Sequence, residues 1–283
     1  MTLLTTNDTA FANAAPVSSN TTRTMIVVPC YNEADRLDGG VFLKALAGSP
    51  DMSFVFVNDG SADATLHCLE ALQKANPSQI DVISLRRNSG KAEAVRKGLQ
   101  HACRVGADRV GYWDADLATP LEAIADFETV LDRYFDITVV YGARRQLLGH
   151  RINRTVSRRA VSRICASLAR LAVGLPIGDT QCGAKLFRNT PTLRRAIDTP
   201  FTAGWLFDVE LFSRIAATTQ KPELSFYEVP LSEWHEVAGS KVSSRAILRS
   251  GVQMLRLIAR RLLTRTEPGK PERRSGPVAP KAI

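Results

Sequence analysis

Short apolar runs alternate with helix-like segments over residues 25–116, and this alternation limits the possible folds more than any other feature. The apolar runs are Met25–Cys30, Ser53–Asn58, Ile80–Leu85 and Val110–Trp113. The segments between them place leucine, valine or alanine at helical spacing. Near-continuous apolar strands separated by helices are typical of a parallel sheet with helices on both faces and right-handed crossovers. The sequence therefore predicts an α/β fold with a mostly parallel sheet.

Polar side chains follow each of the four predicted strands. They form the clusters Asn32-Glu33, Asn58-Asp59, Arg87-Asn88 and Asp114-Ala115-Asp116. The carboxyl ends of parallel strands lie along one edge of a sheet, and open α/β sheets bind ligands at that edge. We therefore expect these clusters to line one binding site.

Asp114 and Asp116 place two carboxylates one residue apart in the turn after the last of these strands. Carboxylate oxygens bind a hard divalent cation, which usually bridges to substrate phosphates. The residues Thr119-Pro120-Leu121-Glu122 predict that a helix follows at once, with Thr119 and Glu122 forming a capping box. An ordinary acidic turn between a strand and a helix is the alternative, and the two aspartates alone do not decide between them.

The composition of the chain ends divides the sequence into four parts. Residues 1–24 are rich in Thr, Asn, Ala and Ser and predict a disordered lead-in, and residues 25–243 form the folded domain. Residues 244–263 predict a basic amphipathic helix, with an apolar arc flanked by arginines, and residues 264–283 predict a disordered tail. The apolar arc contains Leu248, Val252, Leu255, Ile258 and Leu262. No apolar run reaches the roughly 18–20 residues that span a bilayer.

The net charge of +9 is concentrated in two basic segments. Residues 141–170 contain eight arginines and no acid, and residues 241–283 contain eleven Lys or Arg against two acids. Such segments suit a polyanion, and the scarcity of aromatic residues in both favours an anionic membrane surface over nucleic acid. A predicted helix over residues 152–173 either contacts that surface or packs on the core. The five cysteines show no CxxC spacing and indicate reduced thiols of a cytosolic protein.

Four motifs together resemble the family 2 glycosyltransferases, which have the GT-A (Rossmann-like) fold. These motifs are Val28-Pro29-Cys30-Tyr31-Asn32-Glu33, Asn58-Asp59-Gly60-Ser61, Asn88-Ser89-Gly90-Lys91 and Asp114-Ala115-Asp116. Three later motifs are similar to those of dolichyl-phosphate β-glucosyltransferases and, more distantly, dolichyl-phosphate mannose synthases. They begin at Asp179-Thr180-Gln181, at Trp205 and at Trp234-His235.

The resemblance implies inverting transfer of a hexose, with glucose from UDP-glucose as the leading expectation, to a polyprenyl or dolichyl phosphate. It implies Mg²⁺ or Mn²⁺ as cofactor and a nucleotide sugar, a polyprenyl phosphate and a membrane surface as partners. Because residues 1–24 do not resemble the transmembrane anchor of eukaryotic members, we expect peripheral attachment on the cytoplasmic side of a membrane. Transfer of mannose or an N-acetylhexosamine, a non-lipid acceptor, an inactive ligand-binding protein and nucleic-acid binding remain the alternatives.

The resemblance also assigns roles to individual residues. Asp116 and Asp114 are expected to bind the metal. The nucleotide sugar is expected to contact Pro29, Tyr31, Glu33, Asp59, Gly90, Lys91 and Asp114, although Lys91 can equally be a solvated side chain. The sugar or acceptor is expected to contact Gln181, Trp205 and His235.

The chemistry of the acceptor decides which catalytic residues are expected. A phosphate monoester, with a second pKa of about 6, is already anionic near neutral pH. It therefore needs cations that position it rather than a general base. The planar guanidinium matches phosphate, so Arg144 and Arg145 are the first candidates, followed by Lys185 and Lys241. Asp208 is expected to act as a base or an acceptor-site carboxylate, or equally to orient an arginine.

Overall fold

The computed structural model describes residues 22–145, 147–149, 151–152, 166–235 and 244–265. Its first half contains β1 (Thr24–Cys30), α1 (Gly39–Ala47), β2 (Met52–Asn58), α2 (Thr65–Ala75), β3 (Ile80–Ser84), α3 (Lys91–Arg104), β4 (Arg109–Trp113), α4 (Ala123–Arg133) and β5 (Val139–Ala143). Its second half contains β6 (Arg151–Ile152), a helical stretch over residues 166–173, β7 (Ala184–Arg188), α6 (Pro191–Asp198), the 3₁₀ helix η1 (Gly204–Leu206), α7 (Phe207–Thr218), α8 (Pro222–Ser225), β8 (Phe226–Pro230), β9 (Glu233–Trp234) and α9 (Ser244–Arg265).

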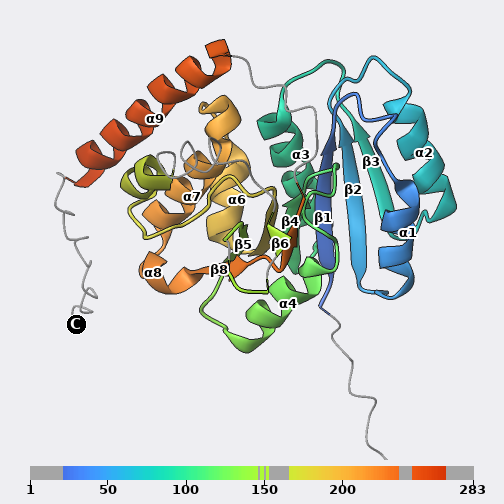
Figure 1. Cartoon of the computed structure of the whole chain (residues 1–283), viewed down its shortest axis with the longest axis horizontal. Coiled ribbons are helices and arrows are strands. Elements are labelled where there is room, and N and C mark those ends of the chain that lie inside the picture. The colour runs from blue at the N-terminus through green and yellow to red at the C-terminus, as the bar shows by residue number, and fades with distance from the viewer. Residues whose placement is uncertain (1–21, 146, 150, 153–165, 236–243, 266–283) are drawn as a thin grey trace, which may run out of the picture.

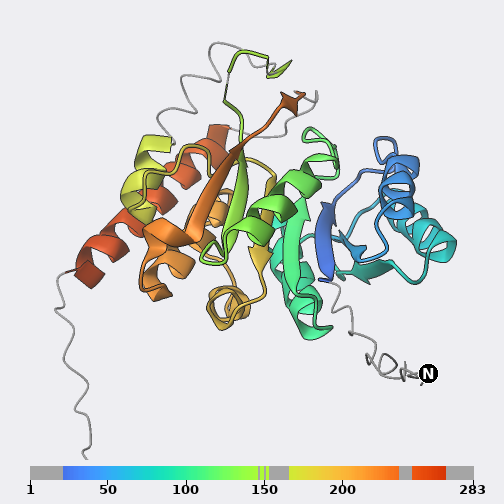
Figure 2. The ribbon, with the colours of Figure 1, turned by 90° about the horizontal axis from the view of Figure 1, so that it is seen from below.

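The described strands form a seven-stranded sheet in the order β3-β2-β1-β4-β7-β5-β8. All neighbouring strands are parallel except β7, which runs antiparallel to both β4 and β5. The mostly parallel sheet predicted from the sequence is confirmed, but the antiparallel strand between β4 and β5 was not predicted. A smaller sheet pairs β6 with β9, and Figure 2 shows it standing away from the body of the molecule.

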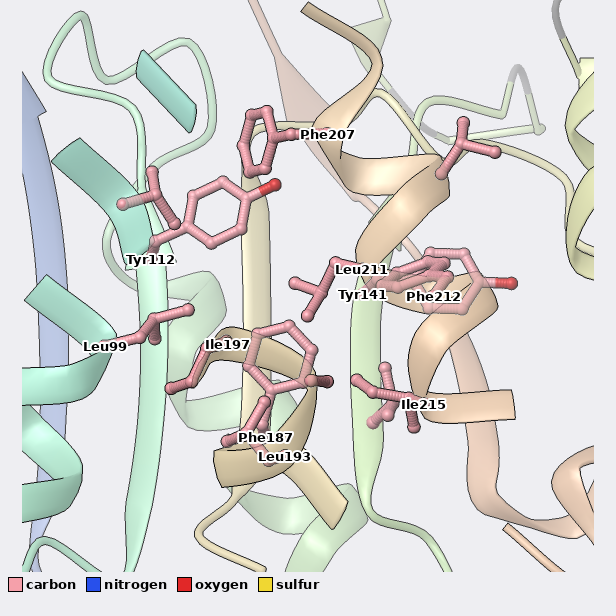
Figure 3. Packing of buried hydrophobic residues seen from close by; sticks show 14 of the residues in the cluster. Leu99, Tyr112, Tyr141, Phe187, Leu193, Ile197, Phe207, Leu211, Phe212 and Ile215 are labelled. Atoms are coloured by element: carbon pink, nitrogen blue, oxygen red, sulfur yellow. The ribbon is translucent and has the colours of Figure 1, made fainter. Parts of the chain in front are cut away.

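Helices cover both faces of the sheet, as predicted (Figure 1). Alternate residues of each central strand point to opposite faces, so Val27 of β1 packs beneath α3 while Val28 packs with Phe42 of α1. One core contains side chains of α3, α6 and α7, and the other contains side chains of α1, α2 and α4. Figure 3 shows the first core, where Phe187 of β7 and Leu211 of α7 point toward each other across the sheet face.

The division of the chain into four parts stays a prediction, and only the bounds of the described elements can be stated. β1 begins at Thr24, and α9 spans Ser244–Arg265 rather than 244–263. Residues 166–173 of the predicted basic helix 152–173 are helical. Residues 1–21, 153–165 and 266–283, on which the remaining predictions fall, lie outside the described part of the chain.

Helix α9 lies along the upper left of Figure 1, beside η1. Met254 and Leu257 bury themselves in the core, and Ile258 packs partly against it. Val252, Leu255 and Leu262 are exposed by 46%, 64% and 58%. The apolar arc predicted for this helix is therefore divided, because Ile258 faces the protein while Val252, Leu255 and Leu262 are exposed. Among the described residues, no helix is long and apolar enough to cross a membrane.

Candidate active site

The Asp114–Asp116 turn leaves β4 at the carboxyl edge of the sheet, where the sequence predicted it. The Asp114 amide donates to the carbonyl of Gly183 at 3.0 Å, and Asp116 Oδ1 accepts from the Ala118 amide at 3.1 Å. Leu117 has a φ of +52°, which turns the chain back sharply. Both carboxylates are partly accessible on this turn.

The capping box predicted at Thr119 and Glu122 is wrong. Helix α4 begins only at Ala123, and no side chain caps it. Instead, the Trp113 indole donates to the Thr119 carbonyl at 2.9 Å, and Thr119 Oγ1 lies 4.0 Å from Cys182 Sγ. These contacts hold residue 119 against the strand, so the chain reaches the helix later than the sequence pattern indicates.

Gly183 fixes the position of the Asp114 carboxylate. A Cβ atom built on Gly183 would lie 2.0 Å from Asp114 Oδ2, closer than real Cβ contacts occur. Gly183 directly precedes β7, and the antiparallel pairing of β7 with β4 brings its backbone beside the aspartate. The acidic turn can take this shape only because residue 183 has no side chain.

We therefore expect Gly183→Ala to displace the Asp114 carboxylate and to weaken Mn²⁺ binding by at least about tenfold, because the metal loses one well-placed ligand. Calorimetric titration with Mn²⁺ measures this change. Gly48→Ala is the matched control, because a Cβ there meets nothing within 4 Å and the backbone φ is −98°. Equal Mn²⁺ affinity in both variants would show that the close approach of Gly183 does not shape a metal site.

Lys91, the first residue of α3, pairs with the Asp-x-Asp turn. Its Nζ lies 2.5 Å from Asp114 Oδ1 and 6.0 Å from the centre of the Tyr112 ring. Gly90 precedes the helix with φ +90°, a conformation that glycine adopts without strain. The predicted neighbourhood of Gly90, Lys91 and Asp114 is thus present in the structure.

A buried charged network lies beneath this turn and joins β4, β7 and α7. Lys185 of β7 stands directly opposite Tyr112 of β4, and its Nζ donates to the Tyr112 hydroxyl at 2.7 Å and to the Cys182 carbonyl at 2.6 Å. Asp208, in the first turn of α7, accepts from the Tyr112 hydroxyl and lies 3.1 Å from Lys185 Nζ. Figure 3 shows Tyr112 with its hydroxyl directed toward α7.

The burial of this network changes the roles expected for two of its members. Lys185 is 0% exposed and Asp208 is 5% exposed. Burial raises the pKa of Asp208, an effect opposed by Lys185 and Lys91, and burial followed by the Asp208 charge raises the pKa of Tyr112 far above its ordinary value. The sequence predicted that Lys185 faces an acceptor phosphate. In the structure it lies under the site as the partner of Asp208. The alternative expectation for Asp208, that it orients a cation, agrees with this geometry, although the cation is a lysine and not an arginine.

Two residues on the predicted nucleoside side, Asp59 and Glu33, are held by neighbouring loops and side chains. Both Asp59 oxygens accept backbone amides, from Ser89 at 2.7 Å and from Gly90 at 2.8 Å. Glu33 pairs with Arg36 at 2.6 Å, while Pro29 is partly buried and Tyr31 is exposed. Asp59 thus joins the ends of β2 and β3 into one loop cluster, and its predicted contact with a nucleobase stays a prediction.

The two predicted phosphate-binding arginines are both held by carboxylates. Arg144 makes a bidentate pair with Asp179 at 2.7 and 2.8 Å, and its guanidinium lies 5.3 Å from the centre of the Trp234 ring. Arg145 pairs with Glu228 at 2.6 Å but remains about half exposed. Of the two, Arg145 is the more accessible to a phosphate.

The remaining predicted residues are distributed around the site. The His235 amide donates to the Ala118 carbonyl at 3.0 Å, so β9 runs beside the Asp-x-Asp turn, and its ring nitrogen lies 2.7 Å from Glu233. Trp205 is half exposed on η1. Gln181 Nε2 is buried without a partner among the described atoms. Lys241 lies outside the described residues.

The turn fits a divalent cation that is held mainly by its substrate. No group of three or more His, Cys, Asp or Glu able to hold a metal occurs among the described residues, so the turn supplies Asp114 and Asp116. Mg²⁺ is usually bound by one or two carboxylates together with substrate phosphates. Burial and then the Asp114 carboxylate raise the pKa of Asp116, which means that its charged form is disfavoured. A nearby cation would stabilise that charged form.

Sequence reasoning missed Tyr112, Gly183, Asp179 and Glu228 as residues that shape the site. Tyr112 and Gly183 gain their contacts from the pairing of β7 with β4, and Asp179 and Glu228 from their pairs with Arg144 and Arg145. Residues 184–188, Ala-Lys-Leu-Phe-Arg, carry no alternating pattern that would have marked β7 or its direction.

The chain is similar in sequence to known proteins. Residues 25–193 match a model of the family described as "Glycosyl transferase family 2". The dolichyl-phosphate beta-glucosyltransferase of Saccharomyces cerevisiae is 33% identical over 240 residues, which cover 77% of this chain and 68% of the yeast protein. The human enzyme of the same name is 29% identical over 242 residues, covering 79% of this chain and 71% of that protein.

A solved structure shares the fold. Glucosyl-3-phosphoglycerate synthase from Mycobacterium tuberculosis, in complex with Mn²⁺, UDP-glucose and phosphoglyceric acid, superimposes with a TM-score of 0.59 at 18% identity. The match covers 88% of this chain and 81% of that one. At this identity the likeness concerns the fold alone.

Proposed function

The chain belongs to glycosyl transferase family 2, and from this premise we propose that it transfers glucose from UDP-glucose to a polyprenyl phosphate, with inversion and with a divalent cation. The sugar and the acceptor are those in the names of the yeast and human relatives. Mn²⁺ together with UDP-glucose in the Mycobacterium tuberculosis structure supports the choice of donor and cation.

The donor diphosphate is placed at the Asp114–Asp116 turn in this proposal. A divalent cation bound there supplies positive charge to the departing nucleoside diphosphate. Lys91, at the amino end of α3, adds a side-chain cation and lies where the helix dipole also favours anions. The nucleoside then extends toward the loops that Asp59 and Glu33 hold together.

One observation favours a phosphate acceptor: the acids around the turn are poorly suited to act as a general base. Asp114, Asp179 and Glu228 are paired with cations, Asp59 accepts two backbone amides, and Asp208 is buried with Lys185 and Tyr112. Asp116 forms no ion pair among the described residues, and this proposal assigns it to the divalent cation. An acceptor hydroxyl would need a base to remove its proton. A phosphate monoester needs none, because it brings its own negative charge.

The proposed reaction is a direct displacement. A phosphate oxygen of the acceptor forms a bond to the anomeric carbon on the face opposite the diphosphate. The bond from that carbon to the diphosphate oxygen breaks, and the diphosphate keeps the electron pair. Arg145, which is half exposed beside β5, is the described cation best placed to orient the incoming phosphate.

We expect radiolabelled UDP-glucose to yield a product that extracts into organic solvent only when polyprenyl phosphate and Mn²⁺ or Mg²⁺ are present. UDP-N-acetylglucosamine, GDP-mannose and a soluble alcohol acceptor are the matched comparisons. Label found only in a water-soluble product would overturn the lipid acceptor. Preferred transfer from another donor would overturn glucose while leaving the lipid in place.

A lipid acceptor requires the enzyme to reach a membrane, and α9 is the described element best suited to this. Val252, Leu255 and Leu262 are exposed within one arc of this helix, and Arg256 is exposed beside them. An exposed apolar stripe next to basic residues suits the interface of an anionic bilayer. Peripheral attachment through α9 is therefore part of the proposal.

We expect Leu255→Glu combined with Leu262→Glu to lower binding to vesicles containing anionic lipid by at least about tenfold, because each change replaces apolar contact with a charge that repels the surface. Co-sedimentation with vesicles measures this. Leu224→Glu is the control, because Leu224 is 51% exposed on α8 and belongs to another surface. Unchanged binding of the double variant would exclude α9 as the membrane contact.

A further inference from the structure

Lys91 is paired with the Asp114 oxygen that a divalent cation at this turn would bind. Its ammonium lies 2.5 Å from Asp114 Oδ1, while the Asp114 backbone is fixed by its hydrogen bond to Gly183. The Lys91 side chain is 41% exposed, so it lies at the mouth of the site and is free to move outward. A divalent cation bound to Asp114 would carry the same sign of charge as the Lys91 ammonium. The two therefore compete for the same carboxylate oxygen.

The surroundings of Lys91 determine where the ammonium can go. Below it, Asp208 is already held by Lys185 at 3.1 Å and by the Tyr112 hydroxyl, and the Tyr112 ring lies 6.0 Å from Lys91 Nζ. The Tyr112 ring and the Asp208 carboxylate are both buried, so a displaced ammonium can move only toward the open side of the turn.

We propose that Lys91 is a charge-exchange residue, which neutralises Asp114 in the substrate-free protein and transfers to the donor diphosphate when a divalent cation takes its place. The inference rests on the proposed function, because it requires a cation and a diphosphate at this turn. It assigns Lys91 opposite effects on the two ligands. Lys91 weakens cation binding when no donor is present, and it strengthens binding of the nucleoside diphosphate once the cation is bound.

The test compares ligand binding, without turnover, in the wild type, Lys91→Met, Lys91→Arg and Lys97→Met. Lys97 lies on the same helix, 4.0 Å from Glu93, and serves as the matched control. Lys91→Met removes the partly exposed ion pair with Asp114, so this variant should bind Mn²⁺ about threefold to tenfold more tightly than the wild type, as measured by calorimetry. With saturating Mn²⁺, the same variant should bind UDP about tenfold or more weakly, because one charge-assisted contact is lost. Lys91→Arg and Lys97→Met should resemble the wild type.

The outcomes distinguish this inference from the function on which it rests. Equal or weaker Mn²⁺ binding by Lys91→Met would overturn the exchange, because Lys91 would then support Asp114 and not compete for it. Unchanged UDP binding would overturn the transfer to the diphosphate. If wild-type protein with UDP binds no Mn²⁺, and Lys91→Met binds none either, the cation itself is wrong and the proposed function fails with it.

Discussion

Asp116→Asn is expected to abolish sugar transfer while the folded protein remains as stable as before or becomes slightly more stable. Asp116 forms no direct ion pair among the described residues, since Lys91 pairs with Asp114 and Asp116 accepts from the Ala118 amide, although the Lys91 and Arg36 charges lower its pKa from a greater distance. A bound cation contributes several kcal/mol of charge stabilisation to the transition state. About 1.4 kcal/mol corresponds to a tenfold change in rate. The loss in kcat/KM should therefore reach about 10³-fold or more.

The expected stability follows from the pKa of Asp116. Burial and then Asp114 raise this pKa in the folded protein. A carboxyl group with a raised folded pKa binds its proton more tightly in the folded state, so its contribution to stability grows as the pH falls through that pKa. At neutral pH the charged Asp116 lowers the free energy of unfolding, and asparagine removes that cost.

Thermal unfolding at pH 7 and a transfer assay on the same preparation measure both effects. Asp126→Asn, at an exposed aspartate in the first turn of α4, is the control and should retain activity. An Asp116→Asn protein that transfers sugar with unchanged metal dependence would contradict the metal assignment. A large drop in its unfolding temperature would indicate a structural role instead.

Lys185→Met is expected to destabilise the protein by about 3–5 kcal/mol, because it leaves the buried Asp208 without its cation. Asp208→Asn alone should also destabilise the protein, because it leaves the buried Lys185 without its carboxylate. The double variant Lys185→Met with Asp208→Asn should recover a large part of the loss, since it removes both buried charges. Urea unfolding of the four proteins measures the coupling.

The two roles considered for Lys185 predict different results. If Lys185 bound the acceptor phosphate, as the sequence suggested, Lys185→Met would raise the KM for the acceptor and leave stability nearly unchanged. Lys97→Met, which removes a partly exposed lysine paired with Glu93 at 4.0 Å, should change stability by less than about 1 kcal/mol. A loss for Lys185→Met no larger than that of Lys97→Met would contradict the buried network.

The first half of the fold was predictable from the sequence because its signals are local. The apolar runs that became β1, β2, β3 and β4 each fall within a few residues of the observed strands. Their polar ends meet at one edge, because parallel strands joined by helices must end there. The antiparallel strand β7 was not predictable in this way, since residues 184–188 take their direction from pairing with β4 and β5 and not from a local pattern.

The sequence by itself determined the family, the helix-covered sheet and the place of Asp114 and Asp116 at its carboxyl edge, because residue type and spacing carry those properties. Only the tertiary structure decided which carboxylate each lysine or arginine of the site pairs with. Lysine and arginine are expected at the surface from their type alone, yet Lys185 is buried against Asp208, Arg144 is held by Asp179, and Lys91 pairs with Asp114. Each of these pairs joins segments far apart in the chain, and the free energy of a charge depends on what surrounds it in space.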